Sequence, residues 1–166
     1  MNELVSRLEG EVLVLRFNRP AKANALNEAL QDALVAALER PAPAAKAIVL
    51  AAEGEKVWSA GADLKEFAEL DKPAAGRKRR ALLRRTLLAV ANCRLPVVAA
   101  VHGKCLGAGA MIALLADELV MAKGAELGLP EIHHGMPTPV GYVIVAARAG
   151  MPVARRMVQD GDPVGT

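Results

Sequence analysis

Two short runs of small residues offer backbone N–H groups for chemistry, residues 59–62 (SAGA) and residues 105–109 (CLGAG). Each run stands where a strand is expected to pass into a helix. The first N–H groups of a helix lack intrahelical partners and lie at the positive end of its dipole, and Gly and Ala let a ligand approach them closely. Two such loops side by side would stabilise an enolate or a tetrahedral oxyanion. Close packing of a helix on a strand also requires small residues, so spacing alone leaves both interpretations open.

Glu131 is a carboxylate that could move a proton. It follows Gly128-Leu129-Pro130 in a loop with little other charge, and apolar surroundings would raise its pKa and suit it to proton transfer. An ordinary solvated glutamate fits the same sequence. His133 and His134 lie close by and are alternative acids or bases, or else surface or packed histidines. No His, Cys and Asp cluster has metal-ligand spacing, and no G-x-S-x-G elbow or Walker-type loop occurs. We therefore expect neither a metal nor a separate cofactor.

The elements that must position these residues alternate along the chain. β-Rich runs predict strands, and apolar residues at helical spacing, bounded by proline or a capping residue such as Asp63, predict helices. Strands are expected at residues 3–8, 11–17, 46–52, 97–101 and 118–122, the first two paired as a hairpin. Helices are expected at residues 26–38, at 63–70, at 73–92, from the second small-residue loop to 115, and near 140–149 and 152–160. This alternation predicts an α/β class in one domain, residues 1–166, with a weak repeat of strand, small-residue loop and helix.

Composition indicates a soluble globular protein with an aliphatic core. Hydrophobic residues make up 53% of the sequence, charged residues 23% and aromatic residues only 2%. No apolar run reaches the roughly 20 residues that span a membrane, and residues 1–4 lack the basic and apolar regions of a secretory signal. Cys93 and Cys105 are the only cysteines. We expect both to be small apolar fillers in a reduced, cytoplasmic setting.

Six cations crowd residues 77–85, although the net charge of the sequence is only +3. A local positive field suits an anionic ligand or partner. We expect the stretch on an exposed helix, because so many cations cannot be buried together without partners. The sequence has one Trp, one Tyr and two Phe, so platforms for base stacking are few. We therefore expect these cations to attract the phosphates of a small ligand rather than to bind nucleic acid.

Four blocks of sequence occur in an order that carries more information than any one of them. They are residues 17–20 with 24–27 (FNRP, NALN), 59–66 (SAGADLKE), 95–103 with 106–109 (LPVVAAVHG, LGAG), and 130–132 with 135–137 (PEI, GMP). Together these blocks resemble the crotonase (enoyl-CoA hydratase/isomerase) superfamily, and they cover most of the chain.

The resemblance implies a crotonase-like spiral of ββα repeats that binds coenzyme A thioesters. The family's oxyanion hole consists of two backbone N–H groups, which fall on Ala62 and Ala108, and a catalytic glutamate of its hydratases falls on Glu131. The segment Ala62-Asp63-Leu64-Lys65 matches the family's CoA-binding segment, and Lys22 is a further candidate for a CoA phosphate. Coenzyme A enters as part of the acyl-CoA substrate. The family also implies a homotrimer or hexamer for the full-length protein.

The sequence departs from the family pattern in three places. Hydratases of the family carry a second catalytic glutamate where this sequence has Met111. After Glu131, residues 138–140 (TPV) replace the usual glycine-rich run, and Pro139 stands where dienoyl isomerases of the family carry an aspartate. The family's C-terminal helices, which cover the acyl site and build trimers, have no counterpart here, so we expect the chain to be truncated.

These departures leave several reactions open. Double-bond isomerisation of an enoyl-CoA needs one carboxylate, which Glu131 would supply. Hydration in the family uses two, and Met111 replaces one of them. We therefore expect an enzyme that isomerises or hydrates an enoyl-CoA through an oxyanion hole and one glutamate. The alternatives are a hydratase in the strict sense, a CoA-thioester hydrolase or lyase, and a member that binds acyl-CoA or RNA without catalysis.

Overall fold

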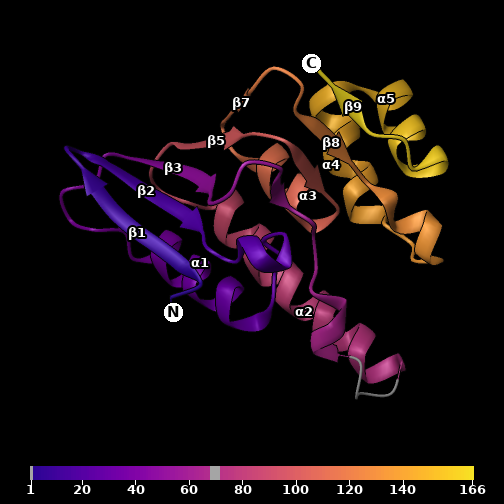
Figure 1. Ribbon diagram of the computed structural model, residues 1–166, viewed down its shortest axis with the longest axis horizontal. Coiled ribbons are helices and arrows are strands. Elements are labelled where there is room, and N and C mark those ends of the chain that lie inside the picture. Colours follow the sequence, from indigo (N-terminus) through magenta and orange to yellow (C-terminus); the bar gives the residue numbers. More distant parts are fainter. Residues whose placement is uncertain (1, 68–71) are drawn as a thin grey trace.

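The computed structural model describes residues 2–67 and 72–166, which form two sheets with helices packed against them (Figure 1). The larger sheet has the strand order β1-β2-β3-β5-β7. Its strands are β1 (Leu4–Glu9), β2 (Val12–Phe17), β3 (Ala47–Ala52), β5 (Val97–Val101) and β7 (Glu118–Met121). β1 and β2 form the predicted antiparallel hairpin, and the remaining pairs are parallel. All five strands confirm the sequence prediction to within one residue at either end.

A smaller sheet of four strands was not predicted. Its order is β4-β6-β8-β9, and its strands are β4 (Val57–Ser59), β6 (Lys104–Leu106), β8 (Glu126–Gly128) and β9 (Val164–Gly165). The first three run parallel, and β9 is antiparallel to β8. Strands of two or three residues are too short to show an alternating pattern, so periodicity could not find them.

The helices follow the predicted order. They are α1 (Glu28–Glu39), α2 (Lys72–Ala91), α3 (Ala108–Leu115), α4 (Pro139–Ala149) and α5 (Met151–Arg155), the last continuing into a π-helical turn at Arg156–Asp160. The helix expected from Asp63 to residue 70 begins as a 3-10 turn, Leu64–Phe67, and the remainder of that prediction falls outside the described residues. Within residues 2–67 and 72–166, no helix is long and apolar enough to cross a membrane.

Strand, short strand and helix recur three times along the chain, as β3-β4-α2, β5-β6-α3 and β7-β8-α4. In each unit the first strand joins the larger sheet and the second joins the smaller sheet. The units therefore advance as a spiral of ββα repeats, which confirms the α/β class and the repeat seen in the sequence. Because β4 and β6 are parallel neighbours, the loops that follow them emerge at the same edge of the small sheet.

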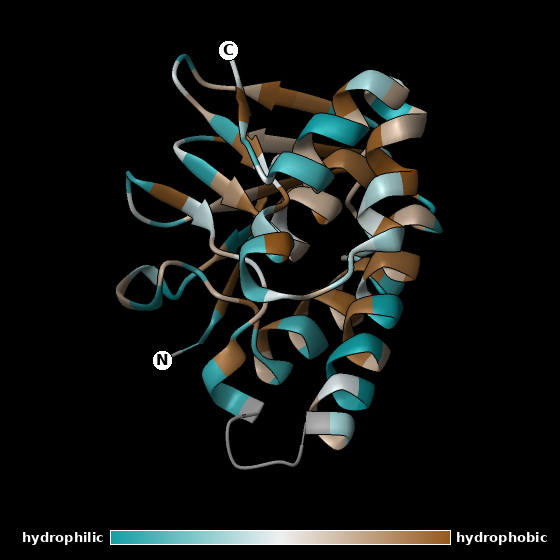
Figure 2. Ribbon diagram, turned by 90° about the vertical axis from the view of Figure 1, so that its right-hand side faces the viewer, coloured by the Kyte–Doolittle hydropathy of each residue, from teal (hydrophilic) through white to brown (hydrophobic). Residues whose placement is uncertain are grey.

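The core is aliphatic and is centred on α3. Residues 108–114 are all buried, so this helix is enclosed by the sheets and by the helices on either side. Phe17 and Trp58 meet edge to face, with ring centroids 4.8 Å apart. Cys105 is fully buried, which raises the pKa of its thiol, and Cys93 packs against the core, so both act as the predicted apolar fillers. Figure 2 shows hydrophobic strands beside helices whose turns alternate between hydrophobic and hydrophilic colours.

The basic stretch of residues 77–85 lies on α2 as predicted, with its cations mostly exposed and Leu82 and Thr86 facing inward. Two of these cations pair with acids of α1. Lys78 Nζ lies 2.6 Å from Glu28 Oε2, and Arg85 pairs with Asp32. Part of the positive charge is therefore neutralised by the neighbouring helix, and Arg79 alone of the six is half-buried.

Candidate active site

The two small-residue loops are in contact. Gly61 has a φ of +89°, and a Cβ built on it would lie 3.0 Å from the Leu106 carbonyl oxygen and 3.3 Å from the Ala108 nitrogen. Such a φ is open to glycine and strained for other residues. The absence of a side chain at Gly61 therefore permits both the backbone conformation and the close approach of the second loop.

Backbone bonds to residues 23–26 hold the first loop in place. The Ala60 N–H donates to the Ala23 carbonyl at 2.9 Å, and the Leu26 N–H donates to the Gly61 carbonyl at 2.8 Å. Ser59 adds a side-chain link, since its hydroxyl donates to the Asn24 carbonyl and accepts from the Gly61 N–H. The loop is thus pinned on both sides of Gly61, and its remaining N–H groups are held at fixed positions.

Asn24 is a positioning residue that the sequence analysis missed. It is fully buried and adopts a left-handed φ of +49°. Its amide donates to the carbonyls of Glu53 and Val57, and its oxygen accepts from the Arg19 N–H. Asparagine tolerates this conformation better than most residues. The sequence block that follows Pro20 contains Asn24, although local sequence could not reveal its two distant partners, Glu53 and Val57.

Asp63 does not point freely toward a ligand. Its Oδ2 accepts from Arg19 Nη1 at 2.9 Å, and Arg19 also pairs with Glu3 at 3.1 Å. The side chains of Arg19 and Asp63 are only 13% and 15% exposed, so the pair ties the loop to the N-terminal segment. Lys22, Leu64 and Lys65, the other predicted CoA contacts, are exposed.

The second loop leads directly into α3. Gly107 is the N-cap residue, with a φ of +54°, and its N–H donates to the Gly128 carbonyl at 2.8 Å. Ala108 is the first helical residue, so its N–H has no intrahelical acceptor. Within residues 2–67 and 72–166, neither the Ala62 nor the Ala108 N–H donates to a protein acceptor. Given the contact at Gly61, covalent geometry keeps these two nitrogens within roughly 7 Å of each other.

Glu131 lies against the second loop. It stands in the 3-10 helix Pro130–His134, which Pro130 begins, and a Cβ on Gly107 would come within 3.0 Å of its Oε1. Its Oε2 is buried and has no hydrogen-bond partner in the part of the chain that the structure describes. Burial raises the pKa of Glu131, while its own backbone N–H and the charges of His134 and Arg79 oppose that rise. The carboxyl is therefore held close to the first turn of α3 with its proton affinity increased.

A cavity of about 200 Å³ opens beside Glu131, and we call it the Glu131 cavity. Its wall combines apolar residues with a few polar groups. The lining residues are Arg79, Arg80, Leu83, Met111, Glu131, Met136, Pro137, Thr138 and Pro139. Met111 is 3% exposed and contributes an apolar wall where the family pattern would place a second carboxylate. The cavity thus contains one described acid.

The two neighbouring histidines have different surroundings. The ring of His133 lies against Gly161, where a Cβ would meet its Nε2. His134 is exposed and acts on Glu131 only through its charge. Neither ring lines the Glu131 cavity. The structure therefore brings together Ala62, Ala108 and Glu131 and leaves both histidines outside the group.

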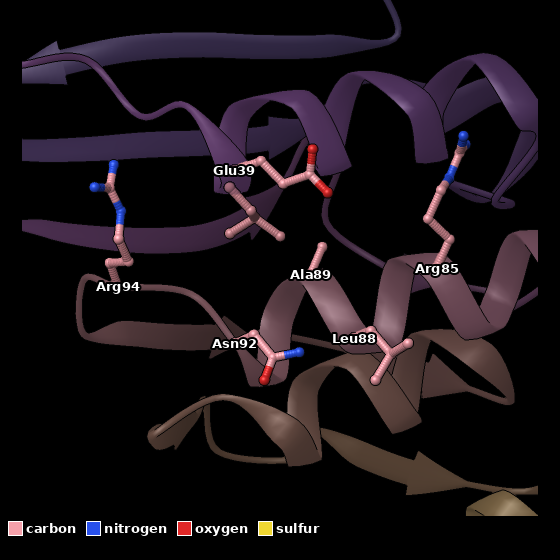
Figure 3. A pocket seen from close by; sticks show the side chains of 7 residues that line it. Glu39, Arg85, Leu88, Ala89, Asn92 and Arg94 are labelled. Carbon is pink, nitrogen blue, oxygen red and sulfur yellow. The ribbon is translucent and has the colours of Figure 1, made fainter.

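A larger hollow, of about 400 Å³, lies between α1 and α2 (Figure 3). It is lined by Leu38, Glu39, Arg85, Leu88, Ala89, Asn92 and Arg94. Glu39 is the one acid among these lining residues, and it is exposed. We assign the candidate site to the smaller Glu131 cavity because Glu131 lines it and the Oε1 of that residue lies against Gly107, directly before Ala108.

Comparisons with known proteins agree with this geometry. Residues 7–166 match the model of the enoyl-CoA hydratase/isomerase family. A 2,3-dehydroadipyl-CoA hydratase of Escherichia coli is 40% identical over 166 residues, which are 99% of this chain and 64% of that protein. A short-chain-enoyl-CoA hydratase of Clostridium acetobutylicum is 32% identical over 162 residues, which are 95% of this chain and 61% of that protein. The chain belongs to the enoyl-CoA hydratase/isomerase family.

Solved structures give the same result for the fold. The enoyl-CoA hydratase from Bacillus anthracis superposes with a TM-score of 0.90 at 27% identity, covering 99% of this chain and 65% of that one. Pseudomonas aeruginosa DspI gives a TM-score of 0.92 at 27% identity, with 100% and 68% covered. These matches confirm the crotonase-like spiral. The chain spans less than two thirds of the length of the two curated relatives.

Proposed function

We propose that this protein acts on an acyl-CoA thioester, using the Ala62 and Ala108 N–H groups as an oxyanion hole and Glu131 as the proton carrier. One observation supports this most strongly. The partly buried Glu131 carboxyl lies against Gly107, and the N–H groups of Ala62 and Ala108 beside it donate to no acceptor among the described residues. A thioester enolate needs donors at its oxygen and a base at its carbon, and both are available within this small region.

The reaction follows from these roles. The Glu131 carboxylate takes a proton from a carbon conjugated with the thioester carbonyl, and the electron pair moves onto the carbonyl oxygen. The two N–H groups stabilise the enolate oxygen, since they are fixed before the charge develops. Glu131 then returns the proton to a different carbon, which shifts the double bond. The raised pKa of Glu131 favours this exchange, because an acid–base group works best when its pKa approaches the working pH.

Hydration is the second candidate. The relatives named above are hydratases by name, which favours it. Met111 opposes it, because its buried thioether offers no charged acceptor to orient a water molecule. We place isomerisation first for that reason, and we keep the CoA-thioester hydrolase and lyase reactions as further alternatives.

We also propose contacts for the substrate. Lys22 and Lys65 are exposed cations near the first loop and suit the phosphates of coenzyme A, while Leu64 offers an apolar contact. Asp63 would act indirectly, by fixing the loop through Arg19. We propose a cytoplasmic homotrimer or hexamer. Exposed apolar side chains on and beside α4, such as Val140 and Val143, would suit an assembly surface.

Ala108→Pro tests the oxyanion hole directly, because proline removes the N–H from that position. Proline is tolerated at the first residue of a helix, and α4 and α5 of this chain already begin with proline near that position. Ala108→Gly is the matched control, since it keeps the N–H. We expect Ala108→Pro to lower kcat for an enoyl-CoA by about 10²–10³-fold, as loss of one oxyanion donor does. Ala108→Gly should stay within a few-fold of wild type.

Two results would contradict the proposal. Wild-type kcat in a folded Ala108→Pro variant would exclude that N–H from the reaction. If the proline variant does not fold, Glu131→Gln decides the matter, because it leaves the backbone unchanged. Turnover that survives Glu131→Gln would transfer the proton chemistry to another group.

A further inference from the structure

Thr138 lines the Glu131 cavity and carries a buried hydroxyl that has no hydrogen-bond partner among the described residues. The residue is 8% exposed, and its Oγ1 makes no hydrogen bond within residues 2–67 and 72–166. Native structures rarely leave a buried hydroxyl unpaired, because removing it from water without a new partner is unfavourable. This hydroxyl therefore needs an explanation.

Helix capping does not satisfy the Thr138 hydroxyl. Thr138 is the N-cap residue of α4, yet its side chain accepts no hydrogen bond from the helix. The hydroxyl lies over Gly141 instead. A Cβ on Gly141 would be 2.7 Å from Thr138 Oγ1 and 3.0 Å from Met111 Cε. The hydroxyl thus stands beside the end of the Met111 side chain, where the site otherwise has an apolar wall.

Glu131 lines the same cavity, and its Oε2 is a second buried oxygen without a hydrogen-bond partner among the described residues. The cavity of about 200 Å³ exceeds the roughly 30 Å³ that a water molecule occupies in the liquid, and a bound water needs two to four polar partners. Thr138 and Glu131 offer two. The first turn of α4, which begins at Pro139, adds positive potential at the same end of the cavity.

We propose that Thr138 binds the oxygen at the third carbon of the acyl chain, as the attacking water before hydration and as the hydroxyl of the product after it. This proposal rests on the proposed function and extends it to the task that Met111 cannot perform. Glu131 takes one proton from the water as its oxygen bonds to the third carbon. The double-bond electrons move to the thioester oxygen, and Glu131 delivers the proton to the second carbon. Thr138 holds the oxygen throughout, so that both hydrogens and the oxygen of water end in the product.

Thr138→Val removes the hydroxyl and keeps the shape, and Thr138→Ser restores a hydroxyl. Thr86→Val is the matched control, because Thr86 is fully buried and its hydroxyl hydrogen-bonds to Leu82 and Gln31. Hydration of crotonyl-CoA, isomerisation of 3-enoyl-CoA and the melting temperature are measured for each. Affinities for 3-hydroxybutyryl-CoA and butyryl-CoA are measured as well, because they do not depend on turnover.

We expect Thr138→Val to lower hydration and the preference for 3-hydroxybutyryl-CoA by about tenfold, the effect of one ordinary hydrogen bond. Isomerisation and the melting temperature should hardly change, and Thr138→Ser should recover most of the loss. Thr86→Val should lower the melting temperature. It should leave unchanged the rate of hydration relative to isomerisation and the preference for 3-hydroxybutyryl-CoA over butyryl-CoA.

The proposal for Thr138 is overturned if Thr138→Val keeps the preference for the hydroxylated ligand, or if it lowers isomerisation and hydration equally. It is also overturned if the wild type isomerises but does not hydrate. If the wild type turns over neither substrate but loses its ligand preference in Thr138→Val, the proposed function fails and the Thr138 site stands. The two claims can therefore fail separately.

Discussion

Gly61→Ala should remove activity from a protein that still folds, because Gly61 is where the two small-residue loops touch. A left-handed φ costs a non-glycine residue about 1–2 kcal/mol. For a chain of this size each kcal/mol of lost stability lowers the melting temperature by about 2–4 °C. The strain alone should therefore lower the melting temperature by about 2–8 °C. The new Cβ would also lie 3.0 Å from the Leu106 oxygen and 3.3 Å from the Ala108 nitrogen. Both are backbone atoms, so the loops must separate by a few tenths of an ångström.

Gly124→Ala isolates the effect of strain. Gly124 has a φ of +78°, and a Cβ there would meet nothing within 4 Å. Calorimetry should find a decrease in melting temperature for both variants, and a larger one for Gly61→Ala because of its added backbone contacts. Only Gly61→Ala should lose kcat/KM for an enoyl-CoA, by about 10²-fold or more, since a displaced oxyanion donor costs about 10²–10³-fold. Wild-type kcat/KM in Gly61→Ala would refute the claim that these loops supply the donors.

Five further outcomes are expected. Asn24→Ala removes three part-buried hydrogen bonds to the backbone and should reduce the unfolding free energy by about 2–4 kcal/mol in urea titrations. In the pH profile of kcat/KM, the midpoint of the acid limb should lie above pH 4.5, because burial raises the pKa of Glu131. Because this pKa is raised on folding, protonation of Glu131 stabilises the fold fully below pH 4.5, and that stability is lost as the pH rises through the folded-state pKa. The melting temperature of Glu131→Gln, relative to that of the wild type, should therefore increase as the pH rises. Met111→Glu should increase hydration of a trans-2-enoyl-CoA, whereas Met111→Gln, similar in shape without the charge, should not. In a salt-controlled filter assay, residues 77–85 should support no base-selective RNA binding.

Much of the fold could be predicted from the sequence because its long elements carry strong periodicity. The five strands of the larger sheet and helices α1 to α4 each extend over four residues or more with clear apolar spacing. The small sheet was missed because its strands have two or three residues, and pairing between distant segments, rather than local propensity, makes them strands. β4 and β6 are nevertheless essential to the site, since they bring Gly61 and Gly107 to one edge.

Some residues of the candidate site could likewise be predicted from the sequence, and others could not. Ala62, Ala108 and Glu131 were identified through motifs that are nearly contiguous in sequence. Asn24 and Thr138 were not, because their importance depends on what surrounds them in three dimensions. Asn24 is defined by two partners far along the chain, and Thr138 by the lack of any hydrogen-bond partner within the described residues. Single-sequence patterns report residue types and spacing, and neither burial nor hydrogen-bond satisfaction is visible in them.

The central claim is that Glu131 moves protons on a thioester whose enolate the two loops stabilise. Proton NMR of butyryl-CoA in D₂O tests it most directly, because exchange at the carbon beside the carbonyl requires enolate formation and neither water addition nor a double-bond shift. The wild type should replace that hydrogen with deuterium. Glu131→Gln should lose the exchange by at least about 10²-fold, within the range of general acid–base catalysis, while its affinity for the ligand is preserved. Exchange at the wild-type rate in Glu131→Gln would contradict the account.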